Sequence, residues 1–324
     1  MRILLTGATG LMGRLTAERL LARGDDVTVL QRRPAGLDTR EILGDVTDAH
    51  LVAEACRRQD VVLHLAAKVD AFGAWPDFER VNVGGTAAIL AGCRSAGVPR
   101  LVNVSSPSVA HAGDDLVGVG ASPADPHAAR SHYSRSKAMA ERAALAANGP
   151  DLAVLSIRPH LVWGPGDTQL IARIVERARS GRLPLIGNGA ALIDATYVDN
   201  AADAMVAAVD AVGRVHGEAL VVSNGEPRPV GEVLRRICAA AGVPGPRGRV
   251  PARLATAAGA VVEKLWRIDG FASEPPLTRF LAEQLSTAHW FDQRRTREAL
   301  NWTPAVGMDE GFHRLAASYA AADG

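Results

Sequence analysis

The chain has 324 residues, 48% of them hydrophobic, which is enough for one large or two modest globular domains with a real core. Its formal net charge is +1 and it has no long basic run, so its charge gives no reason to expect a nucleic-acid partner. No stretch approaches 18 uncharged apolar residues, so we expect no membrane span.

Cysteine usage and the N-terminus both favour a cytoplasmic protein. Cys56, Cys93 and Cys238 are far apart and show neither zinc spacing nor a disulfide framework. We therefore expect no metal site and a reducing compartment. The first residues, "MRILLTGATG", read as a strand that enters a glycine turn, and not as a signal peptide.

The first 160 residues alternate between short apolar runs and amphipathic segments. The apolar runs predict strands at 2–6, 27–31, 41–44, 61–66, 100–105 and 152–157. The amphipathic segments predict helices at 11–23, 49–58, 77–96 and 131–148. This alternation predicts an α/β fold with a Rossmann-type, doubly wound parallel sheet.

The later part of the chain is more irregular. It predicts helices at 168–180, 199–211, 230–241, 253–267 and 309–321, separated by Pro and Gly clusters. We therefore expect a first domain at 1–165, to which 190–215 returns. Residues 166–324 are expected to form mainly a smaller, mostly helical domain that binds the substrate.

A glycine-rich turn follows the first predicted strand. "TGATGLMG" places Gly7, Gly10 and Gly13 where the next helix begins. Glycines there permit a tight turn and let backbone N–H groups approach a pyrophosphate at the helix N-terminus. The motif predicts a dinucleotide site that also includes Thr9, Leu11 and Met12. The open alternative is a strand–helix turn without a ligand.

The end of the second predicted strand bears on the choice of dinucleotide. In such folds an acidic residue there binds the ribose 2′-OH of NAD, whereas arginine accommodates the 2′-phosphate of NADP. "LQRRP" has Gln31 at the place of the acid, followed by Arg32 and Arg33. This pattern favours NADP(H), with NAD(H) as the other candidate. The alternative is a solvated loop that happens to carry two arginines.

Two later strand ends contribute further candidate cofactor contacts. "GDVTD" offers Asp45 for the adenine amine, with Val46 beside it. "HLAAK" offers the small residues Ala66 and Ala67, which let a cofactor lie close to the backbone, followed by Lys68.

"SHYSRSK" places Tyr133 four residues before Lys137, so the two share one face of a predicted helix. With only 3 tyrosines and 3 lysines in the chain, roughly 0.03 such pairs are expected by chance. A carbonyl reductase needs a proton donor at the carbonyl oxygen, and a nearby ammonium lowers the pKa of a phenol. We expect Tyr133 to be that donor and Lys137 to assist it and to reach the cofactor ribose.

A serine cluster, "VSSPSV", follows the fifth predicted strand at its carboxyl end. Doubly wound sheets bind ligands at that edge. Ser105, Ser106 and Ser108 are candidates to polarise the carbonyl group. For each of them, a role in forming the turn is the alternative.

Together these motifs make the chain resemble an extended short-chain dehydrogenase/reductase over nearly its whole length. The carrying segments are "TGATGLMG", "GDVTD", "LHLAA", "VNVGGT", "VSSPSV", "HYSRSK" and "RPHLVWGPGD". The resemblance implies a triad of Ser106, Tyr133 and Lys137. It also implies cofactor contacts from Asn82, Pro159, His160 and Val162, and a homodimer formed through the helix that carries the Tyr/Lys pair.

Three segments resemble the 3β-hydroxysteroid dehydrogenase-like branch, and are most similar to bacterial 2-alkyl-3-oxoalkanoate reductases. They are "SSPSVAHAG", "RPHLVWGPGD" and "EPPLTRFLAEQLSTAHWFD" (274–292). Nucleotide-sugar epimerases and dehydratases with tightly held NAD are one alternative, but they commonly have an asparagine where Leu161 stands. A second alternative is a dinucleotide-sensing regulator without catalysis, but such proteins tend to lose the Tyr/Lys pair.

The sequence therefore predicts an NADP(H)-dependent oxidoreductase that interconverts a ketone and a secondary alcohol. The expected substrate is bulky and apolar, such as a 2-alkyl-3-oxoalkanoate or a 3β-hydroxysteroid. Segment 253–271 has apolar residues at helical spacing and is either a wall or lid for that substrate, with a membrane contact left open, or ordinary core. Its apolar positions are Leu254, Ala257, Ala258, Val261, Val262, Leu265 and Trp266. His111, His132 and His160 are expected to support the site through hydrogen bonds.

Overall fold

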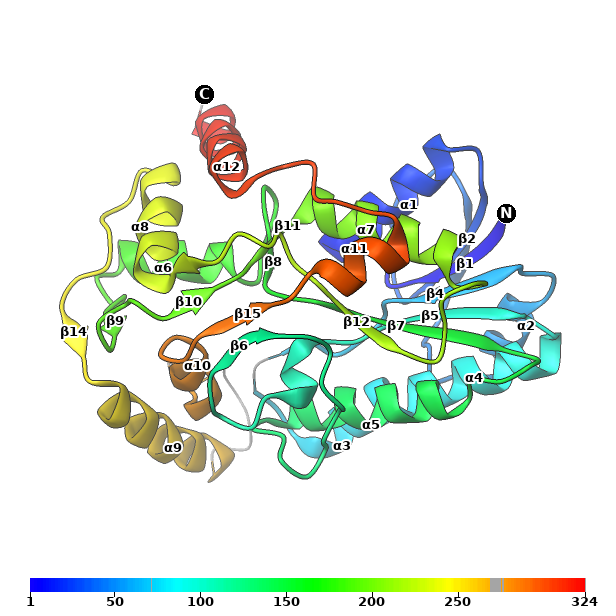
Figure 1. Cartoon of the computed structure of the whole chain (residues 1–324), viewed down its shortest axis with the longest axis horizontal. Helices are drawn as coiled ribbons and strands as arrows, with labels where there is room; N and C mark the ends of the chain where they lie inside the picture. Colours follow the sequence, from blue (N-terminus) through cyan, green and yellow to red (C-terminus); the bar gives the residue numbers. More distant parts are fainter. Residues whose placement is uncertain (71, 269–274, 276, 324) are drawn as a thin grey trace.

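A seven-stranded parallel sheet forms the centre of the protein (Figure 1). The computed structural model describes residues 1–70, 72–268, 275 and 277–323. The strand order is β3-β2-β1-β4-β5-β7-β12, and every neighbouring pair is parallel. The strands are β1 (Arg2–Thr6), β2 (Asp26–Gln31), β3 (Arg40–Leu43), β4 (Val61–His64), β5 (Arg100–Val104), β7 (Ala153–Pro159) and β12 (Ala219–Val222).

Helices cover both faces of this sheet, which confirms the predicted Rossmann-type fold (Figure 1). One face is covered by α1 (Leu11–Ala22), α7 (Val198–Ala211) and α11 (Arg294–Leu300). The other face is covered by α2 (Ala49–Cys56), α4 (Gly85–Ala96) and α5 (His132–Ala146). The predicted helix at 77–96 is less regular than expected, because α3 (Trp75–Phe78) and a π-helical turn (Glu79–Gly84) precede α4.

The chain runs outward from β1 in both directions of the sheet, so the strand order reverses between β1 and β4. The loops at the carboxyl ends of these strands diverge at that point and leave a crevice. In open α/β sheets this crevice is where ligands bind.

The remaining elements form a smaller layer beside the carboxyl ends of β5 and β7 (Figure 1). A second sheet has the order β13-β10-β15-β6, and two further short pairs are β8 with β11 and β9 with β14. The strands of this smaller layer are β6 (Leu116–Val119), β8 (Val162–Trp163), β9 (Leu185–Ile186), β10 (Leu192–Ile193), β11 (Thr196–Tyr197), β13 (Arg228–Pro229), β14 (Arg249–Val250) and β15 (His289–Phe291). Its helices are α6 (Ile171–Arg179), α8 (Val230–Ala240), α9 (Ala252–Ile268), α10 (Arg279–Gln284) and α12 (Met308–Asp323).

Chain connectivity interleaves the two layers. Helix α7, in the segment expected to return, packs beside α1 on the main sheet, and β12 and α11 join the same layer. In the opposite sense, β6 leaves the first part of the chain and pairs with β15. Among the described residues, no helix has the length and hydropathy needed to cross a bilayer.

A buried ion pair fixes α5 against the sheet. Arg158 on β7 and Glu141 on α5 are 2% and 1% exposed, and the guanidinium meets the carboxylate at 2.5 and 2.8 Å. Removing one partner of such a pair typically costs about 3–5 kcal/mol, because it leaves a buried charge. The helix that carries Tyr133 and Lys137 is therefore held in one position relative to β7.

Candidate active site

A groove of about 350 Å³ lies at the crevice between β1, β2 and β4. The residues that line it come from the turns after these strands and from a few more distant positions. Nine of the predicted cofactor residues are among them: Gly7, Thr9, Gly10, Arg32, Arg33, Asp45, Val46, Ala66 and Ala67.

The glycine turn is packed too tightly at two of its three glycines to admit a side chain. Gly7 has a φ of +85°, and a Cβ there would lie 2.8 Å from the Ala66 nitrogen. A Cβ on Gly13 would lie 2.3 Å from the Gly7 oxygen, so this glycine is required by the packing of the turn itself. A Cβ on Gly10 would meet only the Gly7 oxygen, at 3.5 Å. The protein alone does not require glycine at position 10, but a ligand that lies in the groove would.

The N-terminus of α1 adds an electrostatic component. Gly10 is its N-cap and no side chain caps the helix there, so the first-turn N–H groups are not occupied by a capping side chain. Uncapped helix N-termini bind phosphate through these N–H groups and the helix dipole. Leu11 and Met12 stand in the first turn but do not line the groove, and Met12 packs against the core.

Gln31 is the unusual residue at the end of β2. Its side chain is 5% exposed, and neither its amide oxygen nor its amide nitrogen has a hydrogen-bond partner among the described residues. A buried polar group without a partner is costly, unless a ligand supplies one. Arg32 and Arg33 follow it on the exposed rim of the same groove.

Asp45 lies on the same groove and is ionised. Burial opposes its ionisation, but hydrogen bonds from Thr47 and the nearby Arg80 and Arg32 lower its pKa below the ordinary value. Its Oδ1 accepts from the Thr47 nitrogen at 3.0 Å and from the Thr47 hydroxyl at 2.9 Å.

Asn82 and Lys68 are engaged within the protein. The Asn82 Nδ2 donates to the Ser136 Oγ at 2.8 Å and to the Lys68 oxygen at 3.0 Å, and its Oδ1 accepts from the Lys68 nitrogen at 2.7 Å. The Lys68 ammonium pairs with Asp70 at 2.6 Å. Asn82 therefore braces the loop after β4 against α5, and it has no amide hydrogen left for a cofactor.

Ser106 and Tyr133 meet at the carboxyl end of β5. Ser106 begins a short 3₁₀ turn (Pro107–Ala110), accepts a hydrogen bond from the Ser108 nitrogen and lies 2.9 Å from the Ser108 hydroxyl. The Tyr133 phenol lines the same cavity as Ser106, which acts to lower the pKa of the phenol. Ser105, by contrast, is buried, and its hydroxyl has no partner among the described residues.

The expected lowering of the Tyr133 pKa by Lys137 is wrong for this structure. Burial raises the pKa of the phenol, and Ser106 only partly opposes that effect. The Lys137 ammonium donates to the Val104 oxygen at 2.5 Å. Burial lowers the pKa of Lys137 to about 8, with Glu141 acting in the opposite direction.

A second cavity, of about 200 Å³, opens directly at this pair. Its walls come from the turn after β5, the start of α5, the end of β7, and from β6, α10 and β15. The lining residues are Ser106, Pro107, Ser108, His111, Leu116, Tyr133, His160, Leu161, Phe280, Leu281, Gln284, His289 and Phe291. Of the other residues implied at this end, Pro159 ends β7 and Val162 begins β8, and neither lines the cavity.

Leu161 has an unexpected backbone at the cavity wall. Its φ is +42°, in the left-handed region that asparagine adopts more readily than leucine. The local backbone thus keeps the conformation suited to asparagine while the side chain offered to the cavity is apolar.

Three histidines line the cavity, and sequence reasoning singled out only His111 and His160. His289 was missed, because it lies far along the chain, although the 274–292 segment that contains it was singled out. Residues 274 and 276 of that segment lie outside the described residues. His132 does not reach the cavity; its Nδ1 lies 3.0 Å from the Gly73 oxygen, beside another hollow.

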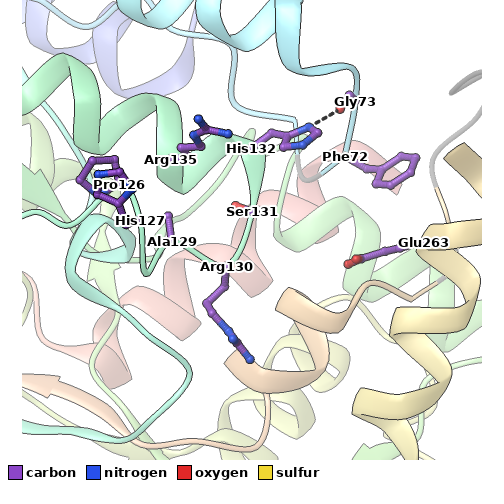
Figure 2. Close-up of a pocket in the computed structure, with 10 residues that line it drawn as sticks. All are labelled: Phe72, Gly73, Pro126, His127, Ala129, Arg130, Ser131, His132, Arg135 and Glu263. Atoms are coloured by element: carbon purple, nitrogen blue, oxygen red, sulfur yellow. Dashed lines mark hydrogen bonds between the residues drawn. The ribbon is translucent and has the colours of Figure 1, made fainter.

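That hollow, of about 400 Å³, lies at the N-terminal end of α5 (Figure 2). Arg130, Arg135 and His132 border it on one side, and Glu263 extends toward it from α9 (Figure 2). Its arginines already have partners: Arg130 pairs with Glu283 at 2.6 Å, and Arg135 lies over the Trp75 ring at 4.4 Å.

Among the described residues, none of α9 lines this cavity, whereas Phe280, Leu281 and Gln284 of α10 do, so a wall formed by 253–271 has no support from the described part of that segment. Ala255 is buried, but Leu254, Val261 and Leu265 are 62%, 60% and 54% exposed. These exposures contradict the alternative of ordinary core packing for this stripe. Gly259 explains the close contact with α10, since a Cβ there would lie 2.6 Å from the Arg279 nitrogen. Residues 269–271 of the predicted segment lie outside the described residues.

Comparison with known proteins identifies a matching family and several similar proteins. The model of the NAD dependent epimerase/dehydratase family matches residues 3–223. A 2-alkyl-3-oxoalkanoate reductase from Stenotrophomonas maltophilia (strain K279a) is 40% identical over 331 residues, which cover 99% of this chain and 100% of that protein. The Homo sapiens sterol-4-alpha-carboxylate 3-dehydrogenase, decarboxylating, is 32% identical over 336 residues, which cover 98% and 88% of the two chains.

Among solved structures, MoeE5 in complex with UDP-glucose and NAD has the same fold. The similarity covers 100% of both chains with a TM-score of 0.78 and 24% identity. At that identity the likeness supports the fold alone.

Proposed function

The chain belongs to the NAD dependent epimerase/dehydratase family and is an NAD(P)-dependent dehydrogenase/reductase, and from this premise we propose that it interconverts a 3-oxo and a 3-hydroxy group on a bulky apolar substrate with NADP(H). The favoured substrate class is a 2-alkyl-3-oxoalkanoate, ahead of a 3β-hydroxysteroid. Two relatives named for such activities, at 40% and 32% identity, support this choice.

One observation carries the proposal: Ser106 and Tyr133 line the same cavity, together with many apolar residues. Lys137 stands one helical turn further along α5. The three residues supply a carbonyl-polarising hydroxyl, a proton donor and a buried cation within one small site.

The protonation states suit reduction near neutral pH. Burial keeps the Tyr133 phenol protonated, so it can donate to the oxygen on which negative charge develops. The Ser106 hydroxyl is oriented by Ser108 and adds a second hydrogen bond to that oxygen. Lys137, with a pKa of about 8, is mainly charged at neutral pH and places a buried positive charge one helical turn from Tyr133.

The groove at the glycine turn would hold the dinucleotide. Gly7, Gly10 and the α1 N-terminus would receive the pyrophosphate, and Gln31, Arg32 and Arg33 would receive the adenosine ribose and its 2′-phosphate. The bound nicotinamide would supply or accept the hydride. Gln31 supports NADP(H), since an amide does not repel a phosphate as a carboxylate would.

The cavity also supports an apolar substrate over a nucleotide sugar. Leu161 presents an apolar side chain at the position where the epimerase branch commonly holds an asparagine, and Phe280, Leu281 and Phe291 continue the apolar lining. A sphere of about 200 Å³ is only about 7 Å across, so long alkyl chains would have to extend beyond the enclosed part.

We include the domain division in the same proposal. Residues 1–165, apart from β6, would form the dinucleotide-binding domain, with 190–215 returning to it and β12 and α11 joining it, and most of 166–324 would form the substrate domain. A homodimer through α5 and a cytoplasmic location stay predictions from the sequence.

A chain-length series tests the substrate class. The 3-oxo acids are assayed by NADPH oxidation, from short to long alkyl chains, beside a steroid ketone and a nucleotide sugar. Each buried methylene contributes about 0.8 kcal/mol, so eight extra carbons could add about 6 kcal/mol, and a third of this would raise kcat/KM roughly 30-fold.

A flat profile, or higher activity on the nucleotide sugar than on any 3-oxo acid, would remove the proposal. A steroid that outperforms the whole series would keep the apolar cavity and reject only the choice of an alkyl acid.

A further inference from the structure

Three imidazoles from distant parts of the chain gather in the wall of the substrate cavity. His111 follows the 3₁₀ turn of the serine cluster, His160 follows β7, and His289 lies on β15. The His111 and His289 ring centres are 5.1 Å apart, and those of His160 and His289 are 5.9 Å apart. The same cavity holds Ser106 and Tyr133, so the histidines face the reacting end of a bound substrate.

Hydrogen bonding fixes the tautomer of His289. The Thr287 hydroxyl donates to the Glu283 oxygen at 2.8 Å, so it can only accept from the His289 Nε2, which lies 2.7 Å away. His289 therefore carries its proton on Nε2. Its Nδ1 is a bare acceptor in a side chain only 1% exposed, with no partner among the described residues.

His111 presents the complementary group. The Gln284 Nε2 lies 3.4 Å from the His111 Nδ1, and in the tautomer in which this amide donates, the proton of the neutral ring is on Nε2. That N–H is buried in a residue 3% exposed and also has no partner among the described residues. His160 differs, since its Nδ1 donates to the Asp194 oxygen at 2.7 Å.

A buried donor and a buried acceptor without partners, in one cavity wall, indicate a ligand group that accepts one hydrogen bond and donates one. We propose that His111 and His289 bind the carboxyl group of the substrate and take it up together with one proton. The inference rests on the proposed function, because the 3-oxo acid is the substrate class that brings a carboxyl group beside the carbonyl.

The geometry of the substrate fits this placement. In a 3-oxo acid the carbonyl carbon and the carboxyl carbon are separated by two C–C bonds of about 1.5 Å each. A cavity of about 200 Å³ is about 7 Å across if spherical. A carbonyl oxygen held by Tyr133 and Ser106 therefore leaves the carboxyl group within reach of the histidine wall.

One net proton accompanies the carboxylate for electrostatic reasons. A carboxylate would accept from the His111 Nε2–H but would be repelled by the bare Nδ1 of His289. A proton on the acid, or on that nitrogen, removes the repulsion. In either case one proton is taken up for each carboxylate that binds. The ionisable groups around His111 are Glu283, Arg130 and Asp114, and around His289 they are His111 and His160.

None of the surrounding ionisable groups can neutralise the bound carboxylate in place of this proton. Glu283 is already paired with Arg130 at 2.6 Å and with Arg279 at 2.9 Å, so neither arginine is free to neutralise the ligand. A metal ion does not fit either, because the described residues contain no group of three or more His, Cys, Asp or Glu side chains arranged to hold one.

The test uses three matched ligands with the whole enzyme and NADP⁺. They are 2-hexyl-3-hydroxydecanoate, its primary amide, and pentadecan-8-ol, which is the same alcohol without the carboxyl group. The variants are His111→Phe and His289→Phe, with His289→Asn as the version that keeps a polar atom near the Nδ1 position.

We expect the ratio of kcat/KM for the acid over that for pentadecan-8-ol to fall about 10- to 100-fold in each Phe variant, as for loss of a hydrogen bond to a charged group. His289→Asn should recover part of the loss. The amide supplies both hydrogen-bond partners without a proton. Calorimetry of the NADPH-saturated wild type near neutral pH, in buffers of different ionisation enthalpy, should show uptake of about one proton with the acid and none with the amide.

An unchanged ratio in the variants, equal kcat/KM for acid and alcohol in the wild type, or binding of the acid without proton uptake would overturn the carboxyl subsite while leaving the reductase intact. Failure of the wild type to oxidise any of the three ligands would instead refute the proposed function itself.

Discussion

Replacing Tyr133 by phenylalanine tests the proton-donor role at the centre of the proposed mechanism. The change keeps the ring in its place on α5 and removes the hydroxyl from the cavity that Ser106 also lines. Burial raises the pKa of this phenol, so the group lost is a protonated acid at neutral pH. Loss of a general acid lowers kcat about 10²–10⁴-fold, which corresponds to about 2.7–5.4 kcal/mol in the activation free energy.

The assay separates chemistry from binding. NADPH oxidation with a long-chain 2-alkyl-3-oxo acid gives kcat, and quenching of intrinsic fluorescence gives the affinity for NADPH. Tyr133 lines the substrate cavity and not the dinucleotide groove, so NADPH affinity should change little. Tyr319→Phe on α12, a half-buried tyrosine outside both cavities, is the matched control. A Tyr133→Phe enzyme that keeps more than about a tenth of the wild-type kcat would refute the assignment.

Three further predictions concern the cofactor groove and the fold. Replacing Arg32 and Arg33 by alanine together with Gln31→Asp should reverse the preference for NADPH over NADH, and the affinity for NADPH should fall about 10- to 150-fold. Equal kcat/KM for both cofactors in the wild type would show that the arginines face solvent only. Gly10→Ala should weaken NADPH binding without lowering the melting temperature. Gly13→Ala should instead destabilise the fold by about 1–3 kcal/mol, because its Cβ would lie 2.3 Å from the Gly7 oxygen. The reverse pattern would contradict the fit of the turn to a ligand. Burial lowers the pKa of His64 to about 3, of His160 to about 4 and of His289 to about 2, so the stability they contribute is present above their unfolded pKa and is lost as the pH falls below it. With an unfolded pKa of about 6.5 for each, the three histidines lower the free energy of unfolding by on the order of 6 kcal/mol when the pH falls from about 7 to about 5. Equal urea midpoints at these two pH values would contradict this prediction.

The sequence was most informative about features whose cause is local. The glycine turn and the Tyr133–Lys137 spacing each depend on a few consecutive residues, and both can be identified without knowing where the rest of the chain lies. Six strands of the main sheet and the helices between them were likewise predicted from periodicity. The seventh strand, β12, was not predicted, although its four residues form a short apolar run like those of the other strands.

Environment, by contrast, could not be read from spacing. The i, i+4 relation of Tyr133 and Lys137 suggested that the ammonium would lower the phenol's pKa, but burial has the larger effect and raises it. The stripe at 253–271 has helical periodicity, yet Leu254, Val261 and Leu265 are exposed on α9. Periodicity shows that a helix has two faces but does not show what covers each face.

The two cavities differ in predictability for the same reason. Most of the dinucleotide groove is built from strand ends, where the fold itself brings consecutive motifs to one edge of the sheet, so nine of its residues were named in advance. The substrate cavity is closed by α10 and β15, which come from the far end of the chain, and its polar wall joins His289 to His111. Neither histidine is informative alone. Their unpartnered Nδ1 and Nε2 atoms become a recognition feature only when β15 pairs with β6 and brings one imidazole beside the other. The wall of this cavity therefore depends on long-range pairing, whereas the groove is lined mainly by residues of local motifs.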